Sequence, residues 1–332
     1  MTDAISTKKP PIPGTVLVMG AGSVGCYLGG CLQAAGAVVD FVGRPRVLAD
    51  LEAHGLRITD LDGADHHLSP HSLRLHAQLP EGLEPELVLL CVKSPATAEA
   101  ARSLLARSPF NTLVISMQNG LRNVETAKLA APGLRFLPGM VPYNIAELAP
   151  GHFHRGSAGQ LAVQGAADLI RWQPLFEAAG IPFEVHADLK PMQWGKLLLN
   201  LNNPVNALSG LPLQAELLDA RHRRQFAALV HEALGVLKAA GIEPARLTPL
   251  PWWLFVWVLR LPTPLFRRLA ARMLRIDPKA RSSMADDLAL GRATEIDVLC
   301  GEVARMAASL GLEAPLNEAM VARIRARHPA SH

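Results

Sequence analysis

The stretch Thr15-Val16-Leu17-Val18-Met19-Gly20-Ala21-Gly22-Ser23-Val24-Gly25 decides the fold of the first half of the chain. Its first five residues, rich in valine and other apolar side chains, predict a short buried strand. Three glycines follow in the spacing Gly-x-Gly-x-x-Gly. A helical pattern then runs to about Ala35, and a second strand is expected at 37–42. Strand, glycine turn, helix and strand in this order indicate a dinucleotide-binding unit.

Each glycine of this turn has a separate expected role. Gly20 makes the tight turn, Gly22 lets the backbone approach a pyrophosphate, and Gly25 lets the helix pack close to the strand. The start of the helix offers unpaired N–H groups and a positive dipole end to the phosphates. The expected cofactor contacts in the turn are Gly20, Ala21, Gly22, Ser23, Val24 and Gly25.

The end of the second strand predicts which cofactor binds. Enzymes that use NAD keep an acidic residue there for the ribose 2′-hydroxyl, whereas an arginine can fork onto a 2′-phosphate. This strand ends in Val42-Gly43-Arg44, and the nearby Asp40 falls too early, inside the strand. We therefore expect NADP(H), bound through Arg44. The alternative is that Arg44 is an ordinary exposed arginine.

The rest of the chain predicts two domains. Further strands near 87–92, 113–117 and 134–140 alternate with helical segments, which indicates a parallel sheet. Alternating residues at 159–163 suggest an antiparallel addition, and a last strand is expected at 182–186. The fold class is therefore α/β, with a Rossmann-type domain over 1–187 and an all-helical domain over 188–332. The expected helices of the second domain are about 190–203, 213–240, 283–310 and 316–327.

Two strand ends of the first domain carry polar side chains. Lys93 follows the third strand, and Gln118-Asn119-Gly120 follows the fourth. Ligands bind at the carboxyl ends of the strands in open parallel sheets. Lys93 is thus a candidate for a phosphate contact, and Asn119 for a contact to nicotinamide or substrate. Both can equally be turn residues.

A polar stripe marks the first helix of the second domain. At about 100° per residue, Lys196, Asn200 and Asn203 fall on one face of an otherwise apolar helix. Burying such groups unpaired costs about 1–3 kcal/mol each, so they need partners or solvent. Pro204 lacks an N–H and clashes with the carbonyl of Asn200, so the helix should kink or end there. A solvated stripe on a surface helix is the alternative.

A second polar cluster lies between Ser282 and Asp297. Ser283 followed by Asp286 resembles a helix N-cap with an acid in the first turn, and Glu295 and Asp297 can be solvated helix charges. In one straight helix, Ser283 and Glu295 would stand about 18 Å apart, too far for one small ligand to bridge. We therefore expect an interruption near Gly291, or contact with a ligand by only one of the two.

The composition narrows the function classes. The 332 residues carry 33 basic and 29 acidic side chains, a net charge of +4 without a long basic run, so nucleic acid is not an expected partner. The apolar run 250–259 is too short to span a bilayer, so no integral membrane segment is expected. The polar segment 1–13 reads as a loose tail without the apolar core of a signal peptide.

Cysteines and histidines predict neither a disulfide frame nor a metal site. The four cysteines, none in a Cys-x-x-Cys spacing, read as reduced core residues of a cytoplasmic protein. His66, His67 and His71 lie in a polar segment of looser strands and turns and are expected to be exposed. The four cysteines are Cys26, Cys31, Cys91 and Cys300.

Along nearly its whole length the chain resembles the ketopantoate reductase (2-dehydropantoate 2-reductase) family. The glycine turn is shared with many enzymes, whereas the lysine–asparagine helix combined with the late serine- and glutamate-bearing segment is distinctive. The matching pieces are Gly20 to Gly25 with Arg44, Val92-Lys93-Ser94, Gln118-Asn119-Gly120, Trp194-Gly195-Lys196-Leu197 with Asn200, and Ser282-Ser283-Met284 through Thr294-Glu295-Ile296-Asp297.

This resemblance implies NADPH-dependent reduction of ketopantoate to pantoate, on the pathway to pantothenate. It implies that Lys196 is the general acid, Glu295 a substrate-orienting acid, and Ser283 a substrate contact. Asn119 and Asn200 are implied contacts to substrate or nicotinamide, and Lys93 and Arg44 match cofactor positions.

The chain departs from the family pattern in two places. A second asparagine often follows the lysine by eight residues; Pro204 stands there, and Asn203 is the best replacement by facing. The segment 247–278 is also longer and more apolar than the family needs, and reads as core plus a solvated helix face, or as a lid, a homodimer surface or a membrane-surface contact. A reductase of another 2-keto acid and a non-catalytic NADP(H) sensor remain alternatives.

Overall fold

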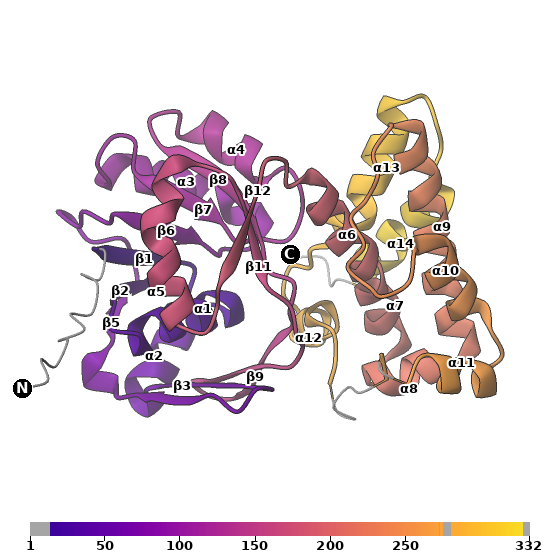
Figure 1. The fold of residues 1–332 in the computed structure, drawn as a ribbon, viewed down its shortest axis with the longest axis horizontal. Coiled ribbons are helices and arrows are strands. Elements are labelled where there is room, and N and C mark those ends of the chain that lie inside the picture. Colours follow the sequence, from indigo (N-terminus) through magenta and orange to yellow (C-terminus); the bar gives the residue numbers. More distant parts are fainter. Residues whose placement is uncertain (1–13, 272, 275–279, 328–332) are drawn as a thin grey trace, which may run out of the picture. The chain divides into compact units, whose positions relative to one another are not determined.

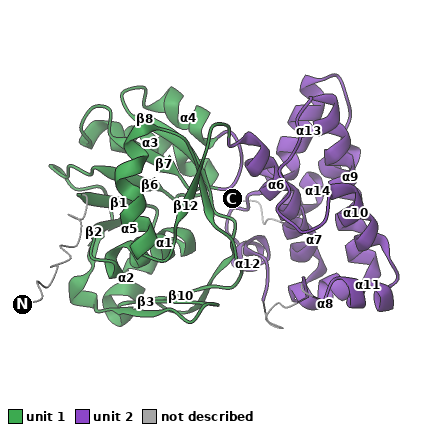
Figure 2. Ribbon diagram, viewed as in Figure 1, with its two compact units in different colours: residues 1–118, 123–188 green, residues 119–122, 189–332 purple. Residues whose placement is uncertain are grey.

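The computed structural model describes residues 14–271, 273–274 and 280–327 (Figure 1). The predicted tail at 1–13 and part of the segment 247–278 lie outside these ranges. The chain forms two compact units (Figure 2). Unit 1 comprises 1–118 and 123–188, and unit 2 comprises 119–122 and 189–332.

Unit 1 is built on an eight-stranded sheet in the order β12-β11-β8-β7-β6-β1-β2-β5. The strands from β8 to β5 are parallel, and β11 pairs antiparallel with β8, which confirms the predicted antiparallel addition. The strands are β1 (Thr15–Met19), β2 (Val38–Val42), β5 (Arg74–His76), β6 (Leu87–Leu90), β7 (Leu113–Ser116), β8 (Arg135–Met140), β11 (Leu161–Gln164) and β12 (Phe183–His186).

Side-chain alternation along β1 explains why both faces of this sheet are covered. Val16 and Val18 belong to one buried cluster, together with side chains of α1 and α5, whereas Leu17 and Met19 belong to another, with side chains of α3 and α4. The helices of unit 1 are α1 (Ser23–Ala34), α2 (Pro45–His54), α3 (Thr97–Arg107), α4 (Asn123–Ala130) and α5 (Gln173–Ala178). The sequence pattern did not indicate α2, although Pro45 at its first position is a helix-start signal.

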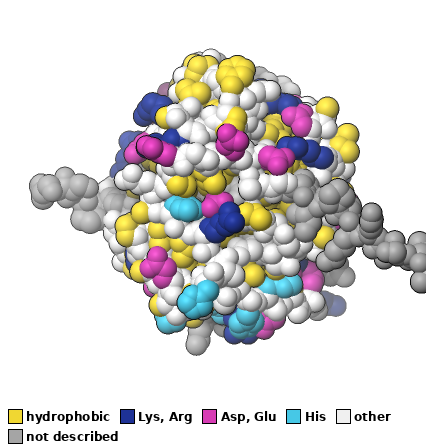
Figure 3. Space-filling view, turned by 90° about the vertical axis from the view of Figure 1, so that its left-hand side faces the viewer, with side chains coloured by type: hydrophobic (Ala, Val, Ile, Leu, Met, Phe, Trp, Pro, Cys, Tyr) yellow, Lys and Arg dark blue, Asp and Glu magenta, His cyan; other side chains and the backbone are white. Residues whose placement is uncertain are grey.

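A second sheet of unit 1, in the order β4-β3-β10-β9, was also not predicted. It joins the segment after α2 to one nearly a hundred residues later, since His152 pairs in parallel with Arg57. Its strands are β3 (Leu56–Asp60), β4 (Asp65–Leu68), β9 (Ile145–Ala149) and β10 (His152–Arg155). The histidines His66, His67 and His71 are exposed, as predicted. In Figure 3, histidine side chains gather in the lower part of the face shown, with acidic and basic side chains interspersed.

Unit 2 is helical in its described residues. Its core is one cluster of apolar side chains centred on α6, α7, α9 and α10. Its helices are α6 (Lys190–Asn200), α7 (Asn202–Ser209), α8 (Leu213–Leu218), α9 (Ala220–Ala239), α10 (Trp252–Arg260), α11 (Thr263–Leu269), α12 (Ser283–Ala289), α13 (Cys300–Ser309) and α14 (Pro315–Arg325). Among the described residues, no helix has the length and apolarity to cross a membrane.

The predicted break at Pro204 occurs three residues earlier. Helix α6 ends at Asn200, Leu201 separates the helices, and Pro204 lies in the first turn of α7. The proline has no N–H to donate and would clash with the carbonyl of Asn200, so the chain interrupts the ladder at that carbonyl. Asn203 therefore belongs to α7 and not to the helix of Lys196.

The predicted interruption near Gly291 is confirmed, but the predicted cap is wrong by one residue. Helix α12 ends at Ala289, and Gly291 has a φ of +62°, which favours glycine after a helix. The N-cap is Ser282, whose Oγ accepts from the N–H of Ala285 at 3.2 Å, and Ser283 is the first helical residue. Capping thus belongs to Ser282, and the side chain of Ser283 is exposed.

The apolar segment around α10 divides its side chains between core and surface. Trp252 is 8% exposed and packs edge-on against Phe255, whereas Trp253 is 71% and Trp257 52% exposed.

All four cysteines are free, as predicted, and burial raises the pKa of the Cys91 thiol to about 12.

Candidate functional site

The glycine turn of unit 1 has the geometry that a dinucleotide needs. Gly20 has a φ of +115°, and a Cβ on it would stand 2.5 Å from the amide nitrogen of Val92. A Cβ on Gly25 would stand 2.1 Å from the carbonyl oxygen of Gly20, so only glycine lets α1 begin this close to the turn. In contrast, a Cβ on Gly22 would meet no atom within 4 Å. Gly22 therefore faces open space, which is the place for a pyrophosphate.

The N-terminus of α1, at Gly22, has the features of an anion-binding site. The amides of Gly20 and Ala21 donate to the carbonyl of Val42 at 3.0 and 2.8 Å, which fixes the turn against the end of β2. Gly22 is the N-cap and has no side chain, so no side-chain bond satisfies the first amides of the helix, starting with Ser23 and Val24. Amides at a helix N-terminus, with the helix dipole, attract phosphate groups.

The surroundings of β2 fit a cofactor with a 2′-phosphate. Arg44 is exposed and occupies the N-cap position of α2, directly after the strand. Asp40 is buried, and His76 Nε2 lies 2.7 Å from its Oδ1, with Arg74 3.8 Å from the other oxygen. The nearby acid is thus held inside the sheet, as its position in the strand predicted. Lys93 is half-buried and precedes a short 3₁₀ turn at Ser94–Ala96, after β6.

The buried Gln118, to which the sequence analysis gave no role of its own, connects the ends of β6 and β7. The Nε2 of Gln118 donates to the carbonyl of Val92 at 2.8 Å and to Oγ1 of Thr97 at 2.7 Å. Its Oε1 accepts from Ser116 at 2.9 Å. This network fixes the segments on which Lys93 and Asn119 stand.

In unit 2, three of the predicted site residues form one chain of hydrogen bonds. Asn119 Nδ2 donates to Glu295 Oε2 at 3.0 Å, and Asn200 Nδ2 donates to Asn119 Oδ1 at 3.4 Å. Asn119 therefore stands between a carboxylate and a second carboxamide that are distant in sequence. Glu295 lies just before the 3₁₀ turn Ile296–Val298, in the interruption after α12.

Lys196 lies one helical turn before Asn200 on α6, and residues four apart share a helix face. Burial lowers the pKa of the Lys196 ammonium from 10.5 to about 8. Its neighbour Gly195 lets the helix come close to the chain beyond α9, because a Cβ there would stand 2.5 Å from the carbonyl of Ala245. Such an amine is protonated at neutral pH and gives up its proton more readily than an ordinary lysine.

Of two further predicted substrate residues, Ser283 lies at the start of α12 and Asn203 lies on α7. Ser283 is exposed in the first turn, and the carbonyl of Asn203 accepts from Ser282 Oγ at 3.2 Å. Because α12 ends at Ala289, Ser283 and Glu295 do not share one straight helix.

An ion pair that the sequence gave no sign of supports the Asn119 segment. Arg122 Nε donates to Glu302 Oε1 at 2.9 Å, and Arg305 donates to the other oxygen of the same carboxylate at 2.6 Å. The Glu302 side chain is only 4% exposed, so it holds Arg122 in a fixed position. No local pattern relates residues 180 positions apart, so this support emerges only from the fold.

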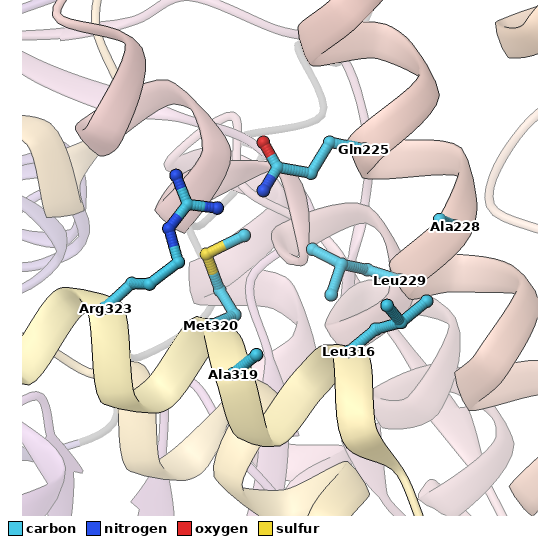
Figure 4. Close-up of a pocket in the computed structure, with 7 residues that line it drawn as sticks. All are labelled: Gln225, Ala228, Leu229, Leu316, Ala319, Met320 and Arg323. Carbon is cyan, nitrogen blue, oxygen red and sulfur yellow. The ribbon is translucent and has the colours of Figure 1, made fainter.

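A separate small pocket opens between α9 and α14 (Figure 4). It is mostly apolar, and none of the predicted site residues lines it. Its lining residues are Gln225, Ala228, Leu229, Leu316, Ala319, Met320 and Arg323.

Comparison with known proteins gives the same family over both units. A family model described as ketopantoate reductase PanE/ApbA matches residues 16–167, and the model of its C-terminal part matches 188–328. A 2-dehydropantoate 2-reductase of Halobacterium salinarum is 28% identical over 308 residues, which cover 91% of this chain and 94% of that protein.

Solved structures agree in fold. A PanE/ApbA family ketopantoate reductase from Ralstonia eutropha is 29% identical, with a TM-score of 0.78 over 95% of this chain and 98% of its own. A D-mandelate dehydrogenase, solved with NADH and anilino(oxo)acetate, is 16% identical, with a TM-score of 0.75 over 95% and 98% of the two chains. At that identity the second likeness concerns the fold alone.

Proposed function

Because the chain belongs to the ketopantoate reductase family, we propose that it catalyses the NADPH-dependent reduction of 2-dehydropantoate to pantoate in pantothenate biosynthesis. The observation that carries the proposal is the placement of Lys196 one turn from Asn200, which is hydrogen-bonded through Asn119 to Glu295. These side chains are an acid, two amides and an orienting carboxylate, the set that a small keto acid requires.

Lys196 is the proposed general acid. When bound, NADPH supplies a hydride for the keto carbon, and negative charge then develops on the carbonyl oxygen. The ammonium group of Lys196 stabilises this charge and donates a proton from Nζ to complete the alcohol. With a pKa of about 8, the side chain is in the donating form at neutral pH, and the donor is lost as the pH rises above that value.

Glu295 and the two asparagines orient the substrate in this proposal. The carboxylate of Glu295 fixes the amide of Asn119, so that the carboxamides of Asn119 and Asn200 present a defined set of donors and acceptors. In this proposal the carboxylate of Glu295 also favours the protonated form of Lys196. Ser283 and Asn203 are the proposed further contacts to the keto acid.

The cofactor part of the proposal rests on Arg44 and the glycine turn. The guanidinium of Arg44 is proposed to bind the 2′-phosphate, Lys93 another phosphate, and the amides of residues 20–25 the pyrophosphate. The open space at Gly22 fits this role, since a side chain there would occupy the approach.

A second candidate is reduction of a different branched or bulkier 2-keto acid, favoured by one observation. Pro204 is buried in α7 at the position where the family often has an asparagine, which removes a polar contact. Loss of NADPH absorbance with a panel of 2-keto acids separates the candidates. Preference for ketopantoate supports the first, preference for another acid supports the second, and turnover of none leaves a sensor of NADP(H). The homodimer and the cytoplasmic location stay predictions, the first checked by analytical ultracentrifugation.

A further inference from the structure

A buried polar cluster in unit 2 has no part in the proposed chemistry. It consists of Asn202 and Asn206 on α7, Glu216 on α8 and Arg223 on α9, which are 8%, 0%, 0% and 0% exposed. Asn202 Nδ2 donates to Glu216 Oε2 at 3.0 Å. Among the described residues, the remaining oxygens, Glu216 Oε1 and Asn202 Oδ1, are fully buried and have no hydrogen-bond donor. Buried acceptors rarely lack a donor, so this pair needs an explanation.

One proton explains both unsatisfied oxygens. A carboxamide and a carboxylic acid can face each other through two parallel hydrogen bonds, N–H to one carboxyl oxygen and O–H to the amide oxygen. The first bond is present between Asn202 and Glu216. If Glu216 carries a proton on Oε1, that oxygen becomes the donor which Asn202 Oδ1 lacks. As a carboxylate, Glu216 would instead leave two buried acceptors without a donor.

The charges around α8 do not hold Glu216 in its ionised form. The guanidinium of Arg223 lies 4.2 Å from the ring centre of Phe266, and its N–H groups donate to the carbonyls of Leu217, Leu259 and Leu261. Asp219, at the start of α9, is paired with Arg221 and lies 4.0 Å from His222.

The other helices packed near Glu216 add little charge. The side chain of Arg224 on α9 is exposed, and α7 has no ionisable side chain. At α12, Arg281 is paired with Asp286, and Asp287 is buried. The Nδ2 of Asn206 donates to the carbonyl of Leu211 at 2.9 Å and is not directed at Glu216. Burial raises the pKa of the Glu216 carboxyl to about 7 and outweighs the hydrogen bond from Asn202 and the attraction of Arg223.

Helix α7 transmits this arrangement to the start of α12. Asn206 Oδ1 accepts from the backbone N–H of Ser282 at 2.9 Å, and Ser282 Oγ donates to the carbonyl of Asn203 at 3.2 Å. Ser282 is also the N-cap of α12. The position of Ser283, the next residue, therefore depends on α7, and α7 depends on the pair between Asn202 and Glu216.

We propose that Glu216 is a positioning residue: as a neutral acid it closes a two-bond ring with Asn202, and through Asn206 and Ser282 this ring holds Ser283 in place for the keto acid. The ring itself is independent of the enzymatic activity. Its effect on Ser283 rests on the proposed function.

Infrared difference spectroscopy on the ligand-free full chain tests the ring. Wild type minus Glu216→Gln should contain the carbonyl band of a neutral carboxylic acid below the pKa of about 7 and a carboxylate band above it. A carboxylate band on both sides of that pKa overturns the ring. This readout does not depend on turnover, so it is informative even if the chain reduces no keto acid.

Steady-state kinetics test the positioning role. Glu216→Gln can form the same ring with two N–H···O hydrogen bonds between carboxamides, so its KM for the keto acid should equal that of wild type. In wild type, ionisation of Glu216 should raise this KM at alkaline pH, and the variant should lack that rise. Glu216→Ala should raise KM for the keto acid about tenfold or more with a small change in kcat, because Asn202 loses its buried partner. Glu313→Gln, an exposed substitution in the same unit, is the matched control.

Two kinetic results overturn the positioning role. One is an alkaline rise of KM that persists in Glu216→Gln, and the other is an unchanged KM in Glu216→Ala. If Glu216→Ala does not fold, the pH profile of Glu216→Gln still decides. Absence of turnover in wild type with any keto acid removes the proposed function and leaves the infrared result standing.

Discussion

Replacing Lys196 by methionine should make the protein more stable and nearly inactive. The folded state lowers the pKa of Lys196 from 10.5 to about 8 through burial. Each pKa unit corresponds to about 1.4 kcal/mol between the two protonation states, so the fall of the pKa from 10.5 to about 8 sets an upper bound of about 3.5 kcal/mol on the cost of the buried charge. Because the side chain is only partly buried, we expect Lys196→Met to gain about 1–3 kcal/mol of unfolding free energy at neutral pH.

The pH dependence of this gain has a definite sign. Between about 8 and 10.5, the unfolded chain keeps a proton on Lys196 that the folded chain has released, so the folded state of wild type gains stability relative to the variant as the pH rises. The advantage of Lys196→Met should thus be full below pH 8 and disappear as the pH passes 10.5. Loss of the general acid should lower kcat by about a hundredfold to ten-thousandfold.

Urea unfolding of the variant and wild type at several pH values measures the first effect, and NADPH oxidation with ketopantoate measures the second. Lys238→Met, an exposed lysine in the last turn of α9, is the matched control and should change stability by less than about 0.5 kcal/mol. A variant that loses stability at neutral pH refutes the burial cost. A variant that keeps the rate of wild type removes Lys196 from the mechanism.

Five further substitutions test separate parts of the molecule. Arg44→Asp should weaken NADPH binding by about tenfold to a hundredfold, the effect of losing a charged hydrogen bond, while NADH binding changes little; an intact preference for NADPH in cofactor titrations would contradict the 2′-phosphate role. Glu295→Gln should move the alkaline limb of the kcat/KM profile to lower pH, since a neutral amide no longer favours the ammonium form of Lys196. A limb that stays in place counts against coupling between Glu295 and Lys196. Gly22→Ala should leave the urea midpoint unchanged and raise the Kd for NADPH, because a Cβ there would meet no atom within 4 Å. Gly25→Ala should lower the midpoint, because its Cβ would stand 2.1 Å from the carbonyl oxygen of Gly20. Glu216→Gln should be more stable than wild type above pH 7 by up to about 3 kcal/mol and lose this advantage toward pH 4.5. The reason is that the raised pKa of Glu216 in wild type stabilises the fold at low pH only. Equal stability of the two proteins at all pH values argues against a raised pKa of Glu216.

Local patterns were enough to predict the nucleotide-binding unit. The strand at Thr15–Met19, the glycine turn and the helix after it depend on neighbours in sequence, and each lies where the pattern placed it. The interruption at Gly291 was predictable for the same reason, because a glycine after a helix readily takes a positive φ. Elements of this kind can be predicted from a short window of sequence.

Choices between neighbouring residues required the tertiary structure. Ser282 and Ser283 are equally good caps by type, and the preference for Ser282 follows from its N–H, which donates to Asn206 Oδ1 from another helix. The contact of Asn119 with Glu295 joins positions 176 apart, and in the second sheet β3 pairs with the distant β10, for example Arg57 with His152. No window of sequence contains both partners of such contacts, so pattern alone cannot locate them.

Three polar side chains of unit 2 stand at or just beyond the ends of helices. Asn200 is the last residue of α6, Glu295 stands in the gap after α12, and Asn202 begins α7. Asn200 reaches a partner outside its own helix, since its Nδ2 donates to Asn119 Oδ1. The apolar residues of the same helix offset the cost of burying Lys196, because each fully buried side chain such as Leu198 contributes about 1.5–3 kcal/mol. Helix α6 can therefore carry a destabilised ammonium group and still remain folded, which is the condition that a buried general acid has to meet.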